Sequence, residues 1–271
     1  MGNFSKDPFQ ELQRSREQGY VGLHVEQGVP VLDRDLNLLA DLVSSTVREI
    51  LARHVGDGVA ERNGAFAVEA GRRDNDLWIA APPGGGASLV AGIQVTIDEP
   101  LAYSEQGDVD PLTTPRDGDR DDVAYLDVWV EEVDAAHDAA LANAGDVAMQ
   151  TSVRLRPAWR VRVTEDAREV PVPAAGHAHC PLALLARPHG VSAIGDEMIV
   201  DLRRTGLHLG DLARRVERIE QLLLVPAVDD ARPGLVAVGG DARGAAPPTP
   251  GRPDEPRSPI ELVTSRRGQA T

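Results

Sequence analysis

Residues 125–133 read YLDVWVEEV, and this alternation of apolar and polar side chains decides the fold class of the chain. Residues 153–163 read VRLRPAWRVRV and alternate in the same way, with apolar residues on one face and arginines on the other. A period of two predicts extended strands and is too regular for a helix. The arginine face consists of Arg154, Arg156, Arg160 and Arg162.

We expect these two strands to pair antiparallel across the connection at residues 134–150. The arginine face then lies beside the polar and aromatic face of the first strand, which carries Tyr125, Asp127, Trp129 and Glu131. Opposite charges across strands contribute about 0.2–1 kcal/mol per pair, and arginine stacks on aromatic rings. The arginine row is therefore expected to find its partners within the sheet.

Shorter apolar runs flank this pair and predict further strands, at residues 65–69, 76–80, 88–97, 181–186 and 198–201. The run at 88–97 alternates through a central glycine, which in mid-strand usually marks a bulge or a close backbone approach. These runs predict a central, mostly antiparallel β domain over residues 64–204. With the helices described next, the fold class is α+β.

The stretch Gln27–Ala40 predicts a strand followed by a helix. Val29, Val31 and Leu32 are typical of a short strand, and Pro30 restricts it to an edge because proline cannot donate to a ladder. Asp33 or Asp35 is expected to cap a helix over Leu36–Arg53, and another short helix is expected from Pro8. The helix has apolar residues at helical spacing, namely Leu36, Leu39, Ala40, Val43, Val47, Ile50 and Leu51. Residues 1–63 form this N-terminal unit.

A heptad pattern near the C-terminus predicts a short coiled-coil helix over residues 205–225. Its apolar positions step by three and four residues, at Leu209, Leu212, Val216, Ile219 and Leu223. So short a helix is marginal alone in water and needs a partner. Pro226 ends it, and the Pro- and Gly-rich composition of residues 226–271 predicts a disordered tail.

Composition limits the classes of function. The chain has 271 residues, of which 42% are hydrophobic and 3% aromatic, so its core must consist mainly of aliphatic side chains. A net charge of −15 argues against binding to nucleic acid or anionic membranes and favours basic partners. No apolar run is long enough to span a bilayer or to act as a signal peptide. We expect a cytoplasmic protein, or one released with a larger particle.

Candidate sites are few, and each has a simpler explanation. His177, His179 and the single cysteine, Cys180, offer zinc-type donors, but they form one cluster without the second ligand pair of structural zinc sites. The acidic run 117–122 lacks the glycine and the final glutamate of a calcium loop. No nucleophile, phosphate-loop or metalloprotease motif is present. The sequence therefore predicts neither a catalytic residue nor a cofactor.

Three blocks of the sequence resemble proteins encoded with phage tails and phage-tail-like contractile injection systems. The first is the N-terminal unit, through Gln27, Gly28, Leu32, Asp33, Asp35 and Asn37. The second comprises residues 125–133 with 158–163, and the third residues 76–79 with 90–95. Together they cover about residues 20–165 in the order of that family. The resemblance implies a structural part of a tail or injection particle, without catalytic residues.

The expected function is accordingly that of a baseplate or fibre-attachment subunit that binds other subunits of a tail-like particle and is oligomeric within it. The residues expected to dock are Val29, Val31, Leu32, Asp33, Asp35, Asn37, Leu209, Leu212, Val216, Ile219 and Leu223. Two alternatives stay open. One is a receptor- or glycan-binding module that uses Trp78, Trp129 and Trp159, and the other is a metal-dependent enzyme at His177, His179 and Cys180.

Overall fold

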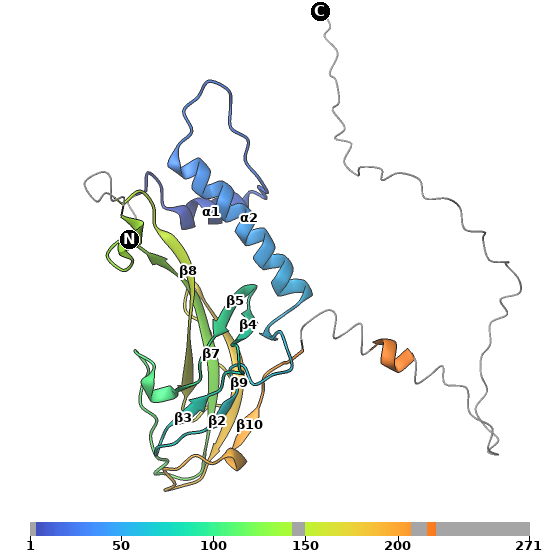
Figure 1. The fold of residues 1–271 in the computed structure, drawn as a ribbon, viewed down its shortest axis with the longest axis vertical. Coiled ribbons are helices and arrows are strands. Elements are labelled where there is room, and N and C mark those ends of the chain that lie inside the picture. Colours follow the sequence, from blue (N-terminus) through green and yellow to red (C-terminus); the bar gives the residue numbers. More distant parts are fainter. Residues whose placement is uncertain (1–3, 143–149, 207–215, 221–271) are drawn as a thin grey trace, which may run out of the picture. The chain divides into compact units, whose positions relative to one another are not determined.

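The computed structural model describes residues 4–142, 150–206 and 216–220. Over these residues the chain is a mixed α+β protein with a mostly β core, as the sequence predicts (Figure 1). Helices α1 (Pro8–Glu17) and α2 (Asp33–His54) precede the strands. Asp7 caps α1 by accepting a hydrogen bond from the Phe9 amide at 2.9 Å, and Pro8 suits the first helical position, which needs no donor.

The largest sheet has the strand order β10-β9-β7-β8, and all of its pairings are antiparallel. Its strands are β7 (Arg120–Val133), β8 (Arg154–Thr164), β9 (His177–Arg187) and β10 (Ile199–Asp201). The predicted pairing is confirmed: Tyr125 faces Arg162 and Glu131 faces Arg156 across β7 and β8. Pro157 is accommodated because β8 is an edge strand, where a missing N–H costs no ladder bond.

Two small antiparallel sheets complete the β region. One has the order β1-β4-β5, with β1 (Gly58–Val59), β4 (Gly86–Val90) and β5 (Ile93–Ile97). The other has the order β2-β3-β6, with β2 (Val68–Ala70), β3 (Leu77–Ile79) and β6 (Leu101–Ala102). Short 3-10 turns lie at Tyr103–Glu105, Ala139–Leu141 and Asp196–Met198.

One hydrophobic core joins the three sheets. Its fully buried members come from each of them, for example Val90 of β4, Ile79 of β3 and Leu126 of β7. Phe66 lies at its centre, with the edge of its ring toward Trp159 at a centroid distance of 4.9 Å. The core is mainly aliphatic, as the low aromatic content requires.

The run predicted as one strand over residues 88–97 is instead a hairpin of β4 and β5. Ala91 and Gly92 both have positive φ, 48° and 76°, as in the tight turns whose twist matches paired strands. The glycine is therefore a turn residue, and the apolar alternation on each side belongs to two strands that pair through Val90 and Ile93. A side chain at Gly92 would also meet the backbone of Arg48 in α2.

Replacing Gly92 by alanine is expected to lower the free energy of unfolding by more than the same change at Gly84. Both glycines have positive φ, 76° and 87°, so each alanine adds about 1–2 kcal/mol of backbone strain. Only at Gly92 does the added methyl group meet another backbone, whereas Gly84 has open space around it. Urea denaturation of both variants measures the difference; equal losses would mean that α2 does not constrain the hairpin.

The strand predicted over Val29–Leu32 is wrong. Gly28 lies in a turn with φ 82°, and residues 30–32 are extended without a strand partner among the described residues. Pro30 removes one donor, and no neighbouring edge supplies a ladder. The helix also begins earlier than predicted, at Asp33, because Leu32 is the capping residue and neither predicted aspartate is.

The chain divides into two units, Met1–Leu224 and Val225–Thr271, and all described residues belong to the first. The predicted tail at 226–271 lies outside the described residues. Among the helices that are described, none has the length and apolar character needed to cross a membrane.

Candidate docking surface

Helix α2 is fixed at both ends by local hydrogen bonds. At its start, the Leu32 amide donates to Asp35 Oδ2 at 3.3 Å, and the Ser5 hydroxyl and amide donate to Asp33. These bonds from Ser5 hold the pKa of the Asp33 carboxyl below its ordinary value. At its end, Gly56 has φ 81° and donates to Leu51 O at 3.0 Å, which closes the last turn.

The apolar face of α2 is exposed. Its members recur at helical spacing and are 40–58% exposed, although such residues normally face a core. They form a continuous stripe about 21 Å long at 1.5 Å per residue. We call this surface the α2 stripe, and it consists of Leu36, Leu39, Val43, Val47 and Ile50. Contiguous exposed apolar surface marks interaction sites.

The opposite face of α2, which is turned toward the rest of the chain, is largely polar. Leu42 is the buried residue of the helix, and Asp41, Ser45, Arg48 and Glu49 are half-buried around it. Burial raises the pKa of Asp41 against the opposing attraction of Arg48. The helix is thus oriented opposite to the usual arrangement, with its polar side inward and its apolar side in solvent.

Contacts with α1 and the β4–β5 turn hold α2 in this orientation. Arg16 of α1 forms an ion pair with Glu49, and the buried Ser15 lies between the helices near Leu42. On the other side, the turn at Gly92 approaches the backbone of Arg48 so closely that no side chain fits there. The residues that turn inward therefore include the charged ones that make these contacts.

The other predicted docking residues of the N-terminal unit lie around the start of α2. Val29, Val31 and Leu32 are 43–57% exposed and extend the apolar surface beyond the α2 stripe. Asp33 and Asp35 are engaged in the local hydrogen bonds described above, and Asn37 is half-buried. Sequence reasoning placed Leu36–Ile50 on a packing helix but did not foresee that this face would be left open.

The predicted heptad helix is described only in part. Residues 216–220 are helical, and Val216 and Ile219 are 47% and 55% exposed. Leu209, Leu212 and Leu223 lie outside the described residues.

The predicted metal candidates do not converge. His177 and His179 share the outer face of β9 with Asp127 of β7: His177 Nδ1 lies 2.7 Å from Asp127 Oδ1, and His179 Nδ1 donates to Pro171 O at 2.9 Å. Cys180 faces the opposite way into the core, where burial raises the pKa of its thiol to about 12. Within the described parts of the chain, no group of three metal-type ligands is assembled.

The predicted charge matching on the outer face of β7 and β8 is confirmed. Asp127 is 3% exposed and accepts a hydrogen bond from Arg162 Nε at 2.9 Å, and Arg156 Nη2 lies 2.5 Å from Glu131. The guanidinium of Arg160 stands 5.8 Å from the centroid of the Trp129 ring. These arginines are therefore neutralised within the sheet.

All three tryptophans of the glycan-binding alternative are half-buried and have partners within the chain. Arg72 covers Trp78 at 4.4 Å from the ring centroid, and His177 stacks on Trp129 at 5.1 Å. Trp159 packs on Phe66 and donates to Thr96 O at 2.9 Å. The structure therefore brings no two tryptophans together as a platform for a sugar.

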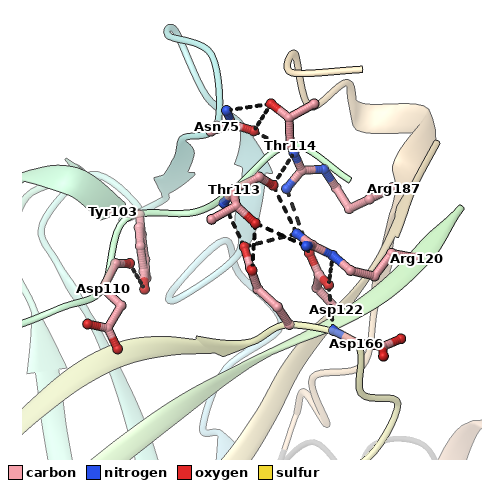
Figure 2. Close-up of polar contacts among 10 residues, drawn as sticks. Asn75, Tyr103, Asp110, Thr113, Thr114, Arg120, Asp122, Asp166 and Arg187 are labelled. Atoms are coloured by element: carbon pink, nitrogen blue, oxygen red, sulfur yellow. Dashed lines mark hydrogen bonds and ion pairs between the residues drawn. The ribbon is translucent and has the colours of Figure 1, made fainter. Parts of the chain in front are cut away.

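A buried charge network at the start of β7 was missed by sequence reasoning (Figure 2). Asp122 is fully buried; Arg120 Nε lies 2.7 Å from it, Arg187 Nη1 lies 3.7 Å away, and the Asp166 amide donates to it at 2.9 Å. Arg187 is also buried, and burial lowers its pKa against the attraction of Asp122. Asp119 accepts from the His189 amide, so the acidic residues of 117–122 turn to different partners.

Glu165 belongs to the same network and makes a pH-dependent contribution to stability. Burial alone would raise its pKa, but hydrogen bonds from Thr113 and the charge of Arg120 outweigh burial and lower it below the ordinary 4.5. The carboxylate therefore stabilises the fold above pH 4.5, and this contribution is lost as pH falls through the lower folded-state pKa.

Glu165→Gln is expected to flatten the decline in unfolding free energy as pH falls below 4.5. Urea denaturation of wild type and variant between pH 6 and pH 3 measures this, with Glu169→Gln as a control because Glu169 is exposed. A decline as steep as that of wild type would contradict the assignment to Glu165.

No family model matches the chain, and no curated protein is similar to it. Two solved structures are similar in fold. The crystal structure of TssK matches with a TM-score of 0.37 and 11% identity, over 76% of this chain and 50% of that one. The baseplate complex from the type VI secretion system matches with a TM-score of 0.34 and 14% identity, over 79% of this chain and 71% of that one. The chain thus spans half the length of TssK, and TM-scores this low carry no functional argument.

Proposed function

We propose that this chain is a structural, non-enzymatic subunit of a phage-tail-like contractile injection system, at its baseplate or fibre-attachment end. The class of particle is suggested by the resemblance of three sequence blocks. The observation that carries the docking role is the α2 stripe, in which Leu36, Val43 and Ile50 are each more than half exposed. A helix held with its polar side inward needs a neighbour to cover its apolar side.

The role of each part follows from its surface. The β core, with its internally matched charges, is the rigid body that positions the helix. The α2 stripe and the adjoining Val29, Val31 and Leu32 form the docking surface for neighbouring subunits. The net charge of −15 favours basic surfaces around that apolar contact.

Purification of the particle from the native host tests the proposal. The protein should sediment with sheath and tube in gentle salt and remain at a fixed ratio to them through a second gradient. A soluble cytoplasmic enzyme from the same lysate is the control for trapping. If the chain stays in the soluble fraction while the particle sediments intact, the proposed function is wrong.

A further inference from the structure

We infer that the α2 stripe binds the α2 stripe of a second copy of this chain, with the two helices antiparallel and a two-fold axis at Val43. The proposed function leaves the neighbour on this surface unnamed, and the inference rests on that function by naming it. The argument uses the spacing of the stripe, the size of the residues beside it and the charges at its ends.

The spacing of the stripe is symmetric about its centre. Leu36 and Ile50 each lie seven residues from Val43, and Leu39 and Val47 each lie four residues from it. A two-fold axis at Val43 therefore sets Leu36 against Ile50 of the second copy and Leu39 against Val47 of the second copy. Such self-complementarity is what an isologous dimer contact requires, since the same patch serves both subunits.

Small residues beside the stripe permit close contact. Ala40 and Ser44 are exposed on the same side of the helix as Val43 and Val47. Helices pack at axial distances of about 8–10 Å depending on the side chains between them, and small residues favour the shorter distance. The stripe and its border thus form a surface that a second helix can cover along its whole length.

The charges at the two ends of α2 favour the antiparallel arrangement. The first turn is acidic, with Asp33 and Asp35, and the last turn is basic, with Arg53 and His54. Antiparallel packing brings the acidic turn of each copy beside the basic turn of the other, because Asp33 and Arg53 are both ten residues from Val43. It also opposes the helix dipoles, whereas parallel packing would bring like charges together.

The orientation of the helix supports a second copy as the occupant. The contacts of α2 with α1 and with Gly92 lie on its polar face, so covering the stripe disturbs none of them. An occupant that lacked the reversed charge order would leave one end of the helix against an unmatched turn. A second α2 supplies both the apolar seam and the reversed charges.

Cysteine cross-linking of the full chain tests the inference. Val43→Cys should give a disulfide-linked dimer under mild oxidation, because the two thiols meet at the axis. Leu36→Cys should give none alone, since its copies lie about 21 Å apart, but should cross-link when mixed with Ile50→Cys. The native Cys180 is buried, so unmodified protein is the control for background.

The solution mass gives an independent measurement. Unmodified protein should have twice the 29.0 kDa mass of one chain, and Val43→Asp should be a monomer with unchanged circular dichroism. Val172→Asp is the matched control, because Val172 is 92% exposed and lies outside the α2 stripe, and it should remain a dimer. A monomeric unmodified protein, a Leu36→Cys cross-link without Ile50→Cys, or a dimer unaffected by Val43→Asp would each overturn the inference.

The two hypotheses fail in different ways. If the chain sediments with the particle but Val43→Cys gives no cross-link there, the two-fold contact is wrong and the subunit role stands. If the cross-linked dimer forms but never sediments with the particle, the contact stands and the proposed function is wrong.

Discussion

Replacing Asp122 by asparagine is expected to lower the free energy of unfolding by about 3 kcal/mol. The side chain is fully buried between Arg120 and Arg187, so the substitution leaves two guanidinium groups with less compensation in a region that water does not reach. Arg187 is affected most, because among the described residues its Nε already donates no hydrogen bond. Urea denaturation at neutral pH measures the loss through the midpoint at constant slope.

The neighbouring residue supplies the control for this prediction. Asp121 forms an ion pair with Arg168, whose side chain is 78% exposed. Solvent screens such a pair, so Asp121→Asn is expected to cost less than about 1 kcal/mol. Similar losses at the two positions would show that burial does not govern the energetics of this network.

The second large effect concerns assembly rather than stability. Val43→Glu combined with Val47→Glu is expected to reduce incorporation into the particle at least about tenfold, because charges on the docking surface must lose water for the contact to form. The unfolding free energy of the isolated chain should change by less than about 0.5 kcal/mol, since both side chains are more than half exposed.

Quantitative immunoblotting of gradient fractions measures this incorporation, with unfolding curves for each variant. Val172→Glu is the control, because it introduces the same charge at an exposed valine outside the α2 stripe. Normal incorporation of the double variant would contradict the docking role, and a large loss of stability would show that the stripe packs within the chain.

Local patterns in the sequence predicted much of the β region. The pairing of β7 and β8 follows from the alternation around Asp127 and from the arginines opposite it, and the ion pair between Arg162 and Asp127 confirms it. The helix α2 follows equally from its spacing. In each case the signal lies within a few residues of the feature that it predicts.

Features that depend on distant residues were not predictable in this way. The Ala91–Gly92 turn was taken for a mid-strand irregularity, because alternation on both sides of a glycine is shared by a bulged strand and a hairpin. The network at Asp122 joins β7 to Arg187 at the end of β9, and no local pattern connects them. The direction in which α2 faces depends on α1 and Gly92, neither of which shapes its own periodicity.

The outward apolar side of α2 has a consequence for the chain before assembly. Five aliphatic side chains stay in water until a partner covers them, so the solubility of the free protein depends on concentration and on the supply of that partner. Synthesis without the partner then favours non-specific association through the same helix. The timing of production relative to the rest of the particle is therefore part of how this chain stays folded and usable.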